Sequence, residues 1–154
     1  MTEQMIKKVL ITGANGFIGG SLMRYYQNQG QDVVGVDLVG NGNDIIEGDI
    51  AQPDSISNVL QECDVIIHTA ALVSNAMQDS DMWRVNVLAT RNLIEAAKEH
   101  KVRRFVQISS VVAYGNSAEG ELDESQPVHA DGGSYVLTKL ASEHVVLGAQ
   151  ANDN

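Results

Sequence analysis

Two side chains near the end of the chain, Tyr135 and Lys139, have types and a spacing suited to acid–base chemistry. Three residues separate them, so on a helix they lie one above the other on the same face. A tyrosine hydroxyl normally ionises near pH ~10, and a neighbouring ammonium favours the phenolate. Such a pair is suited to general acid–base catalysis near neutral pH. The same spacing is also typical of an amphipathic helix with a surface lysine, so the rest of the chain has to decide.

A second candidate site is a glycine-rich turn near the start of the chain. The apolar run Val9–Ile11 predicts a buried strand, glycines follow at positions 13, 16 and 19, and a helical pattern begins at Phe17. Glycine lets the backbone approach an anion closely, and a helix start offers unpaired N–H groups and a positive dipole end. Asp37 ends the next predicted strand, where a carboxylate accepts hydrogen bonds from an adenosine ribose and repels a 2′-phosphate. This combination favours NAD over NADP. The alternative is that Asp37 is simply a solvated aspartate at the end of a strand.

Other residues that could contact a ligand follow the remaining strands. Asp49 could reach an adenine amino group and Ile50 could cover a ring, although an aspartate after a glycine often forms only a turn. The small residues Ala70 and Ala71 follow the fourth strand and would leave space at the edge of a sheet. Ser110 follows the fifth strand, where its hydroxyl could bind a reacting oxygen or simply begin a loop.

These positions must be held by the strands and helices that alternate along the whole chain. The predicted strands are Val9–Ile11, Asp32–Asp37, Ile45–Asp49, Asp64–His68 and Arg104–Ser109, and the predicted helices are Phe17–Asn28, Pro53–Glu62, Asp81–His100 and 134–149. The first helix carries one apolar face at Phe17, Ile18, Leu22 and Tyr25, and the third carries one that begins at Trp83. Helices between strands imply parallel pairing with right-handed crossovers. The pattern predicts an α/β protein with a three-layer, doubly wound parallel sheet.

The bulk properties restrict the class of partner. A chain of 154 residues can bury one hydrophobic core, and its net charge of −10 disfavours nucleic acid or an anionic membrane surface. Cys63 is the only cysteine, which excludes an internal disulfide and suggests a reducing compartment. The polar segment Met1–Lys8 lacks a signal-peptide core, and no apolar run is long enough to cross a membrane. We therefore expect a cytoplasmic protein that binds a small molecule, with no metal site.

Seven short stretches occur in an order that matches one known family and span nearly the whole chain. On these stretches the sequence resembles the extended short-chain dehydrogenase/reductase family, which includes NAD-dependent epimerases and dehydratases. The stretches are Thr12-Gly13-x-x-Gly16-x-x-Gly19, Asp37, Gly48-Asp49-Ile50, His68-x-Ala70-Ala71, Asn86-Val87-x-x-Thr90-x-Asn92-Leu93, Ser109-Ser110-x-x-x-Tyr114-Gly115 and Tyr135-x-x-x-Lys139.

The resemblance implies a Rossmann fold over 1–154, with about five strands in the order 3-2-1-4-5 forming one NAD-binding domain. It implies that Tyr135 is the acid/base and that Lys139 binds the nicotinamide ribose. Ser110 matches the catalytic serine, and Asn86 matches an asparagine that supports the site through backbone and water contacts. The implied cofactor-binding residues are Gly13, Asn15, Gly16, Phe17, Ile18, Gly19, Asp37, Asp49, Ile50, Ala70, Ala71, Tyr135 and Lys139.

The implied reaction is hydride transfer between NAD and a secondary alcohol or ketone of a nucleotide sugar or a 3β-hydroxysteroid-like compound. Family members usually run to about twice this length, so the C-terminal strands and substrate region are expected to be missing here. We expect a fragment of a longer protein, or a sheet edge covered by a partner. The resemblance favours a homodimer through the helices at 81–100 and 134–149. The alternative function is a non-catalytic NAD-binding module.

Overall fold

The computed structural model describes residues 6–73, 79–114, 121–123, 125–129 and 132–151. The chain divides into two compact units. The first, which we call the sheet unit, comprises Met1–Ala70 and Asn92–Ile108. The second, which we call the helical unit, comprises Ala71–Arg91 and Ser109–Asn154. Each unit is described separately below.

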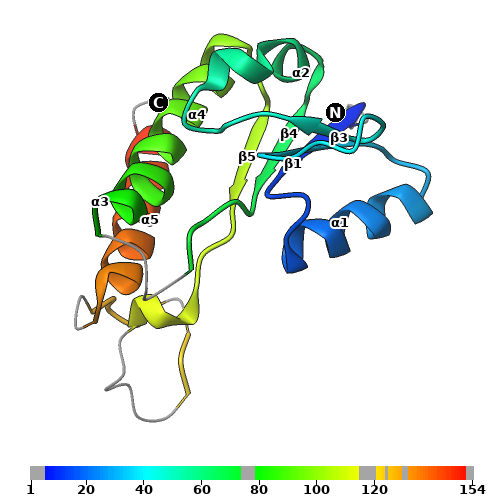
Figure 1. The fold of residues 1–154 in the computed structure, drawn as a ribbon. Coiled ribbons are helices and arrows are strands. Elements are labelled where there is room, and N and C mark those ends of the chain that lie inside the picture. Colours follow the sequence, from blue (N-terminus) through cyan, green and yellow to red (C-terminus); the bar gives the residue numbers. More distant parts are fainter. Residues whose placement is uncertain (1–5, 74–78, 115–120, 124, 130–131, 152–154) are drawn as a thin grey trace. The chain divides into compact units, whose positions relative to one another are not determined.

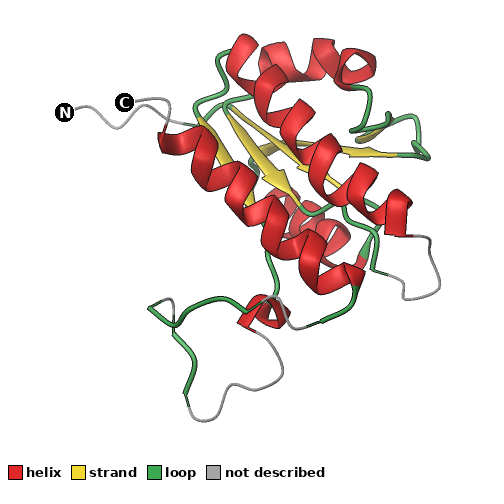
Figure 2. Cartoon of the chain, turned by 90° about the vertical axis from the view of Figure 1, so that its left-hand side faces the viewer, coloured by secondary structure: helices red, strands yellow, loops and turns green. Residues whose placement is uncertain are grey.

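The sheet unit contains a five-stranded parallel sheet, drawn in yellow in Figure 2. Its strands are β1 (Lys8–Thr12), β2 (Asp32–Asp37), β3 (Ile45–Glu47), β4 (Val65–His68) and β5 (Arg104–Gln107). They lie in the order β3-β2-β1-β4-β5, which confirms the predicted topology. The strand order reverses at β1, which pairs with β2 on one side and β4 on the other. Ligands of such sheets bind beyond the carboxyl ends of the strands at this reversal.

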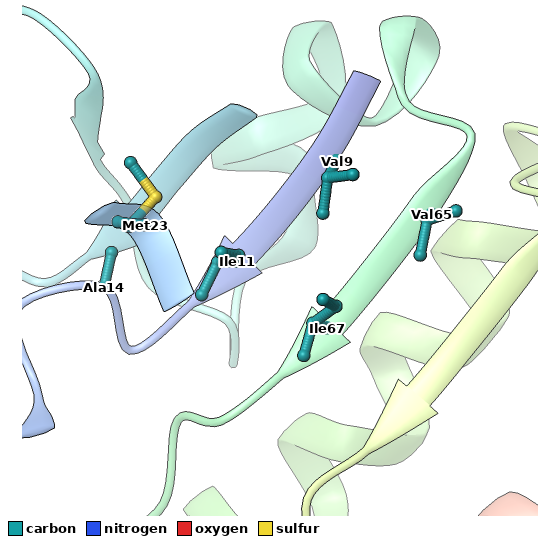
Figure 3. Close-up of a cluster of buried hydrophobic side chains, with 6 residues drawn as sticks. All are labelled: Val9, Ile11, Ala14, Met23, Val65 and Ile67. Carbon is teal, nitrogen blue, oxygen red and sulfur yellow. The ribbon is translucent and has the colours of Figure 1, made fainter. Parts of the chain in front are cut away.

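Both faces of the sheet are covered, which explains why its central strands are apolar throughout. On one face, alternate residues of β1 and β4 pack with Ala14 and with Met23 of helix α1 (Phe17–Asn28), as Figure 3 shows. The intervening side chains, including Leu10 and Ile66, are fully buried and point to the opposite face. Figure 1 shows helix α2 (Ser57–Glu62), which follows the short 3₁₀ helix η1 (Pro53–Ile56), across the sheet from α1.

The bounds of α1 are confirmed, but its predicted apolar face is wrong except at Leu22, which packs against the core. Phe17 and Tyr25 are 93% and 58% exposed, whereas Gly19 and Met23 are buried. Gly19 has no Cβ, so the backbone of α1 can sit directly against Gly13. This close approach, rather than the distribution of large apolar side chains, selects the face that α1 turns toward the sheet.

The helical unit is built around α5 (Ser134–Ala151), which packs against α3 (Asp79–Met82) and a π-helical stretch η2 (Trp83–Ala89) (Figure 1). The chain continues directly from η2 into α4 (Thr90–Glu99), most of which belongs to the sheet unit. The predicted helix at 81–100 is therefore present, but a π-helical stretch was not expected, and Trp83 is 41% exposed. A short 3₁₀ helix, η3 (Val111–Tyr114), also contacts α5. Gly115 and part of the predicted loop to Gly133 lie outside the described residues.

Candidate active site

The glycine turn is held between the end of β2 and the segment that follows β4. Gly13 has a φ of +70°, a backbone conformation that favours glycine, and its N–H donates to the Val36 carbonyl over 2.8 Å. A Cβ at Gly13 would lie 2.8 Å from the backbone nitrogen of Ala70. Gly16 closes the turn by donating its N–H to the Gly13 carbonyl over 3.0 Å. The structure thus brings together Gly13 and Ala70, two of the residues that the resemblance implies bind the cofactor.

The start of α1 leaves backbone groups exposed beside the glycine turn, because no side chain caps them. A Cβ at Gly19 would overlap the carbonyl of Gly13 and lie 2.9 Å from Thr69 Oγ1. No side chain caps the helix start at Gly16, and its first turn, which is fully described, contains no acidic residue. Phe17 and Ile18 are exposed beside it. Backbone N–H groups and the positive end of the helix dipole are therefore available to an anion.

The Asp37 carboxylate is joined to the glycine turn. Its Oδ2 accepts a hydrogen bond from the Asn15 backbone N–H over 2.9 Å, and its Oδ1 accepts one from Leu38 N over 2.8 Å. The Asn15 side chain in turn donates to the Val39 carbonyl over 2.7 Å. A carboxylate has about four acceptor sites, so Asp37 retains capacity for two ribose hydroxyls. The structure therefore fixes Asp37 at the end of β2 in an orientation set by the turn itself.

Asp49 and Ile50 lie in a separate turn after β3. Asp49 Oδ1 accepts from Ala51 N over 2.9 Å, which is the local aspartate turn that the sequence left open. Ile50 is buried, with 7% of its surface exposed. Ala71, the remaining predicted contact on this side, is half-buried and belongs to the helical unit.

His68 has a structural position, as its type suggested. It is 1% exposed, and its Nδ1 lies 2.6 Å from Thr12 Oγ1. Thr69 Oγ1 donates to the Thr12 carbonyl over 2.7 Å. These bonds hold the carboxyl ends of β1 and β4 together, directly below the glycine turn.

Tyr135 and Lys139 lie on the first turns of α5 in the helical unit. Tyr135 is half-buried, and Lys139 is only 4% exposed. Desolvation lowers the pKa of Lys139, and the Glu143 carboxylate one turn further along the helix acts in the opposite direction. Glu143 also accepts a hydrogen bond from the Ser109 hydroxyl. Glu143 was not predicted, although its spacing of four residues from Lys139 is a recognisable signal.

Asn86 and Ser110 complete the predicted catalytic set. Asn86 is 2% exposed in the π-helical stretch, and its side chain bonds the backbone of Leu72 and the hydroxyl of Thr138. The two bonds to Leu72 are backbone contacts of the kind that the resemblance implies, whereas the bond to the Thr138 hydroxyl was not predicted. Ser110 is half-buried at the start of η3, where its Oγ lies 3.5 Å from Val112 N. Thr138 is a further buried polar residue at this site that the sequence interpretation missed.

A model of the NAD dependent epimerase/dehydratase family matches residues 9–154. The chain belongs to this family. The match confirms the resemblance, and NAD is the cofactor that the family's name carries, as predicted. Among curated members of this and related groups, a dTDP-glucose 4,6-dehydratase from Streptomyces niveus is 31% identical over 91% of this chain and 48% of that protein. Sterol demethylase protein B from Methylococcus capsulatus is 34% identical over 90% of this chain and 45% of that protein.

The fold also agrees with solved structures of the family. MoeE5 in complex with UDP-glucose and NAD superposes with a TM-score of 0.84 and 35% identity, covering 94% of this chain and 49% of that one. This likeness confirms the Rossmann fold. The chain spans about half the length of the curated relatives it matches. Among the residues that the structure describes, none of the helices is long and apolar enough to cross a membrane.

Proposed function

We propose that this chain is the NAD-binding part of an oxidoreductase of the epimerase/dehydratase type. It transfers a hydride between NAD and a secondary alcohol or ketone of a nucleotide sugar. The observation that carries the proposal is the glycine turn, in which the Asn15 backbone orients the Asp37 carboxylate. The nucleotide sugar is supported by the dTDP-glucose dehydratase relative and by MoeE5, whose structure holds UDP-glucose and NAD.

The sheet unit fits the phosphate and ribose parts of NAD. The glycines leave a cradle that any Cβ at Gly13 or Gly19 would fill, and the start of α1 offers N–H groups to the phosphates. Asp37 would accept hydrogen bonds from the adenosine ribose hydroxyls. The full set of residues proposed to hold the cofactor is Gly13, Asn15, Gly16, Phe17, Ile18, Gly19, Asp37, Asp49, Ile50, Ala70, Ala71, Tyr135 and Lys139.

The helical unit supplies the proton chemistry. The Tyr135 side chain would accept the proton of the substrate alcohol as the phenolate while the carbon is oxidised, and the resulting phenol would return the proton in the reverse direction. The Ser110 hydroxyl holds the reacting oxygen, and the Lys139 ammonium binds the nicotinamide ribose. Lys139 is almost fully buried, so water screens its charge weakly. Bound NAD supplies the hydride acceptor and donor.

Two alternatives are tested against this proposal. A sterol-like hydroxy compound is favoured by the 34% identity with sterol demethylase protein B. The second alternative is a non-catalytic NAD-binding module, which would bind NAD through the glycine turn without turnover.

The test combines NAD binding with turnover by this chain. Calorimetry measures NAD affinity, and absorbance follows NADH formation with UDP-glucose, UDP-glucuronic acid, dTDP-glucose and a 3β-hydroxysteroid. Tyr135→Phe should abolish turnover and retain NAD affinity, while Tyr25→Phe, on the exposed side of α1, should retain both. Binding without turnover on any compound would support the module, and absence of NAD binding would refute every version of the proposal.

We further propose that residues 1–154 form one NAD-binding domain of a cytoplasmic homodimer, with contacts through the helices at 81–100 and 134–149. Exposed apolar side chains on these helices support the dimer, namely Trp83 (41%), Leu88 (53%) and Leu147 (61%). The cytoplasmic location rests on the composition of the chain.

A further inference from the structure

A buried polar network in the helical unit joins Leu72 to the helix turn that carries Tyr135. Asn86 Oδ1 accepts a hydrogen bond from Leu72 N over 2.7 Å, and Asn86 Nδ2 donates to the Leu72 carbonyl over 3.0 Å. The same Nδ2 donates to Thr138 Oγ1 over 3.1 Å. A primary amide has two N–H donors, so both donors of this buried side chain have partners. Asn86 therefore forms hydrogen bonds both to the backbone of Leu72 and to the side chain of Thr138 in α5.

Thr138 is the point where this network enters α5. Its hydroxyl oxygen accepts a hydrogen bond from the Asn86 side-chain amide, and the hydroxyl donates its own proton to the Tyr135 carbonyl over 3.0 Å. Thr138 is 0% exposed and directly precedes Lys139. A hydroxyl has a single proton to donate, so the chain of donors runs from Asn86 through Thr138 to the Tyr135 backbone. Because Thr138 is fully buried, water could replace a lost hydrogen-bond partner of its hydroxyl only if the surrounding residues rearranged.

We propose that Thr138 is a positioning residue whose hydroxyl, through Asn86, couples the Leu72 segment to the turn of α5 that bears Tyr135 and Lys139. A second side-chain bond, from the Ser134 hydroxyl to Asp79, ties the start of the same helix to α3. The first turns of α5 are therefore fixed at two points along the neighbouring helical segment.

Ser142, one turn further along α5, is a buried hydroxyl residue whose hydrogen bonds can be compared with those of Thr138. Its hydroxyl donates to the Lys139 carbonyl over 2.8 Å, and the residue is 0% exposed. A hydroxyl that bonds a carbonyl in its own helix is a common local arrangement. Thr138 makes the same local bond, but it also receives a donor from another element. Ser142→Ala is therefore a matched control, because it removes only the local bond.

The catalytic consequence rests on the proposed function, in which Tyr135 acts on the reacting oxygen. A small displacement of an acid/base group lowers the rate strongly, on the order of a hundredfold for ~1 Å. Lys139 lies on the same turn as Tyr135 and is proposed to bind the nicotinamide ribose. Loss of the Thr138 hydroxyl should therefore lower kcat, and it should weaken NAD binding by a smaller factor.

Amide hydrogen exchange of Leu72, followed by NMR in the folded chain, tests the coupling without any substrate. Thr138→Val should accelerate exchange at Leu72 by about tenfold, because the Asn86 amide loses a partner. Thr138→Ser should restore slow exchange, and Ser142→Ala should leave it unchanged. In an Asn86→Leu background, Thr138→Val should cause no further acceleration. Wild-type exchange at Leu72 in Thr138→Val would overturn the proposal.

A variant that fails to fold still leaves the proposal testable in the wild-type chain. The side-chain amide protons of Asn86 should exchange at least about tenfold more slowly than those of exposed Asn43. Equal rates would overturn the proposal.

Turnover separates this inference from the proposed function. Thr138→Val should lower kcat by about tenfold with a smaller change in the KM for NAD, and Thr138→Ser should restore kcat. If the wild type turns over none of the compounds tested, the proposed function fails. The exchange experiment alone then tests whether Thr138 is coupled to Leu72 through Asn86. Unchanged kcat in an active Thr138→Val enzyme would overturn the positioning role.

Discussion

Gly19 and Asp37 determine the cofactor end of the molecule through contacts with Gly13 and Asn15. Gly19 allows the backbone of α1 to rest against the Gly13 carbonyl. Asp37 accepts the Asn15 N–H, so the carboxylate and the turn stabilise each other's position. Each residue therefore has one structural role and one proposed binding role, which substitutions can separate.

Replacement of Gly19 by alanine should disrupt the turn. The added Cβ meets backbone on one side and Thr69 Oγ1 at 2.9 Å on the other, so α1 has to move. We expect a loss of about 2–4 kcal/mol in the free energy of unfolding and at least about tenfold weaker NAD binding. Urea denaturation and calorimetry measure these quantities. Gly20→Ala is the control, because its Cβ would lie 3.2 Å from the Ala14 carbonyl oxygen and 3.6 Å from the flexible Arg24 side chain, without overlapping either. Equal NAD affinity in both variants would contradict the role of Gly19.

Replacement of Asp37 by arginine should shift the cofactor preference from NAD toward NADP. The substitution removes a ribose acceptor and introduces a cation that attracts a 2′-phosphate. Calorimetric titration with both dinucleotides measures the ratio of affinities, which we expect to change by at least about tenfold. Asp32→Arg makes the same change of charge at the opposite end of β2, and it should leave the ratio unaltered. A ratio that responds equally to both variants would reflect net charge alone.

The helical segment from α3 to α4 shows how tertiary contacts modify a regular element. Its apolar pattern fits an ordinary helix, yet Trp83–Ala89 is π-helical and Trp83 is exposed. Asn86 lies in the middle of this stretch, where the Thr90 hydroxyl donates to its carbonyl over 2.8 Å. Single π-helical turns are frequent at functional sites, and this one carries a predicted catalytic residue.

The exposed apolar side chains of this segment and of α5 give the dimer proposal a direct test. Leu88→Glu places a charge at the proposed interface, so the dimer should dissociate at least about tenfold more readily. Sedimentation velocity over a range of protein concentrations measures the change. Leu38 is also exposed, but it follows β2, so Leu38→Glu should leave the association unchanged. A monomeric wild-type chain would reject the interface outright.

Lys139 makes the free energy of unfolding of the whole molecule depend on pH in the alkaline range. Desolvation holds its folded-state pKa below the unfolded value of about 10.4, so the unfolded chain binds more protons between these two values. The free energy of unfolding therefore rises with pH across that window, and the stabilisation is lost as pH falls through the folded pKa.

Lys139→Met should remove this contribution, because methionine has no titrating group. Relative to Lys139→Met, the wild type should become more stable as the pH rises from neutral toward about 10. Urea denaturation at a series of pH values measures the difference. Lys98→Met removes an exposed ammonium from α4 and controls for the change in net charge. A constant difference between wild type and Lys139→Met would contradict the burial of a charged Lys139.

The sequence determined the order of the elements, because apolar strands alternate with helices and such a pattern permits few parallel topologies. The bounds of α1 and β2 follow from glycine and aspartate at their ends. The proximity of Gly13, Asn15 and Asp37 also follows, since parallel strands bring their carboxyl ends to one edge.

Only the tertiary structure decided the inward face of α1, the π-helical stretch and the network of Asn86 and Thr138. Each depends on a contact between residues far apart in the chain. Gly19 faces the sheet because its missing Cβ meets Gly13, and Asn86 is held by Leu72 and Thr138. Local periodicity records which residues are apolar, but it contains no information about close backbone approach or about buried hydrogen-bond partners.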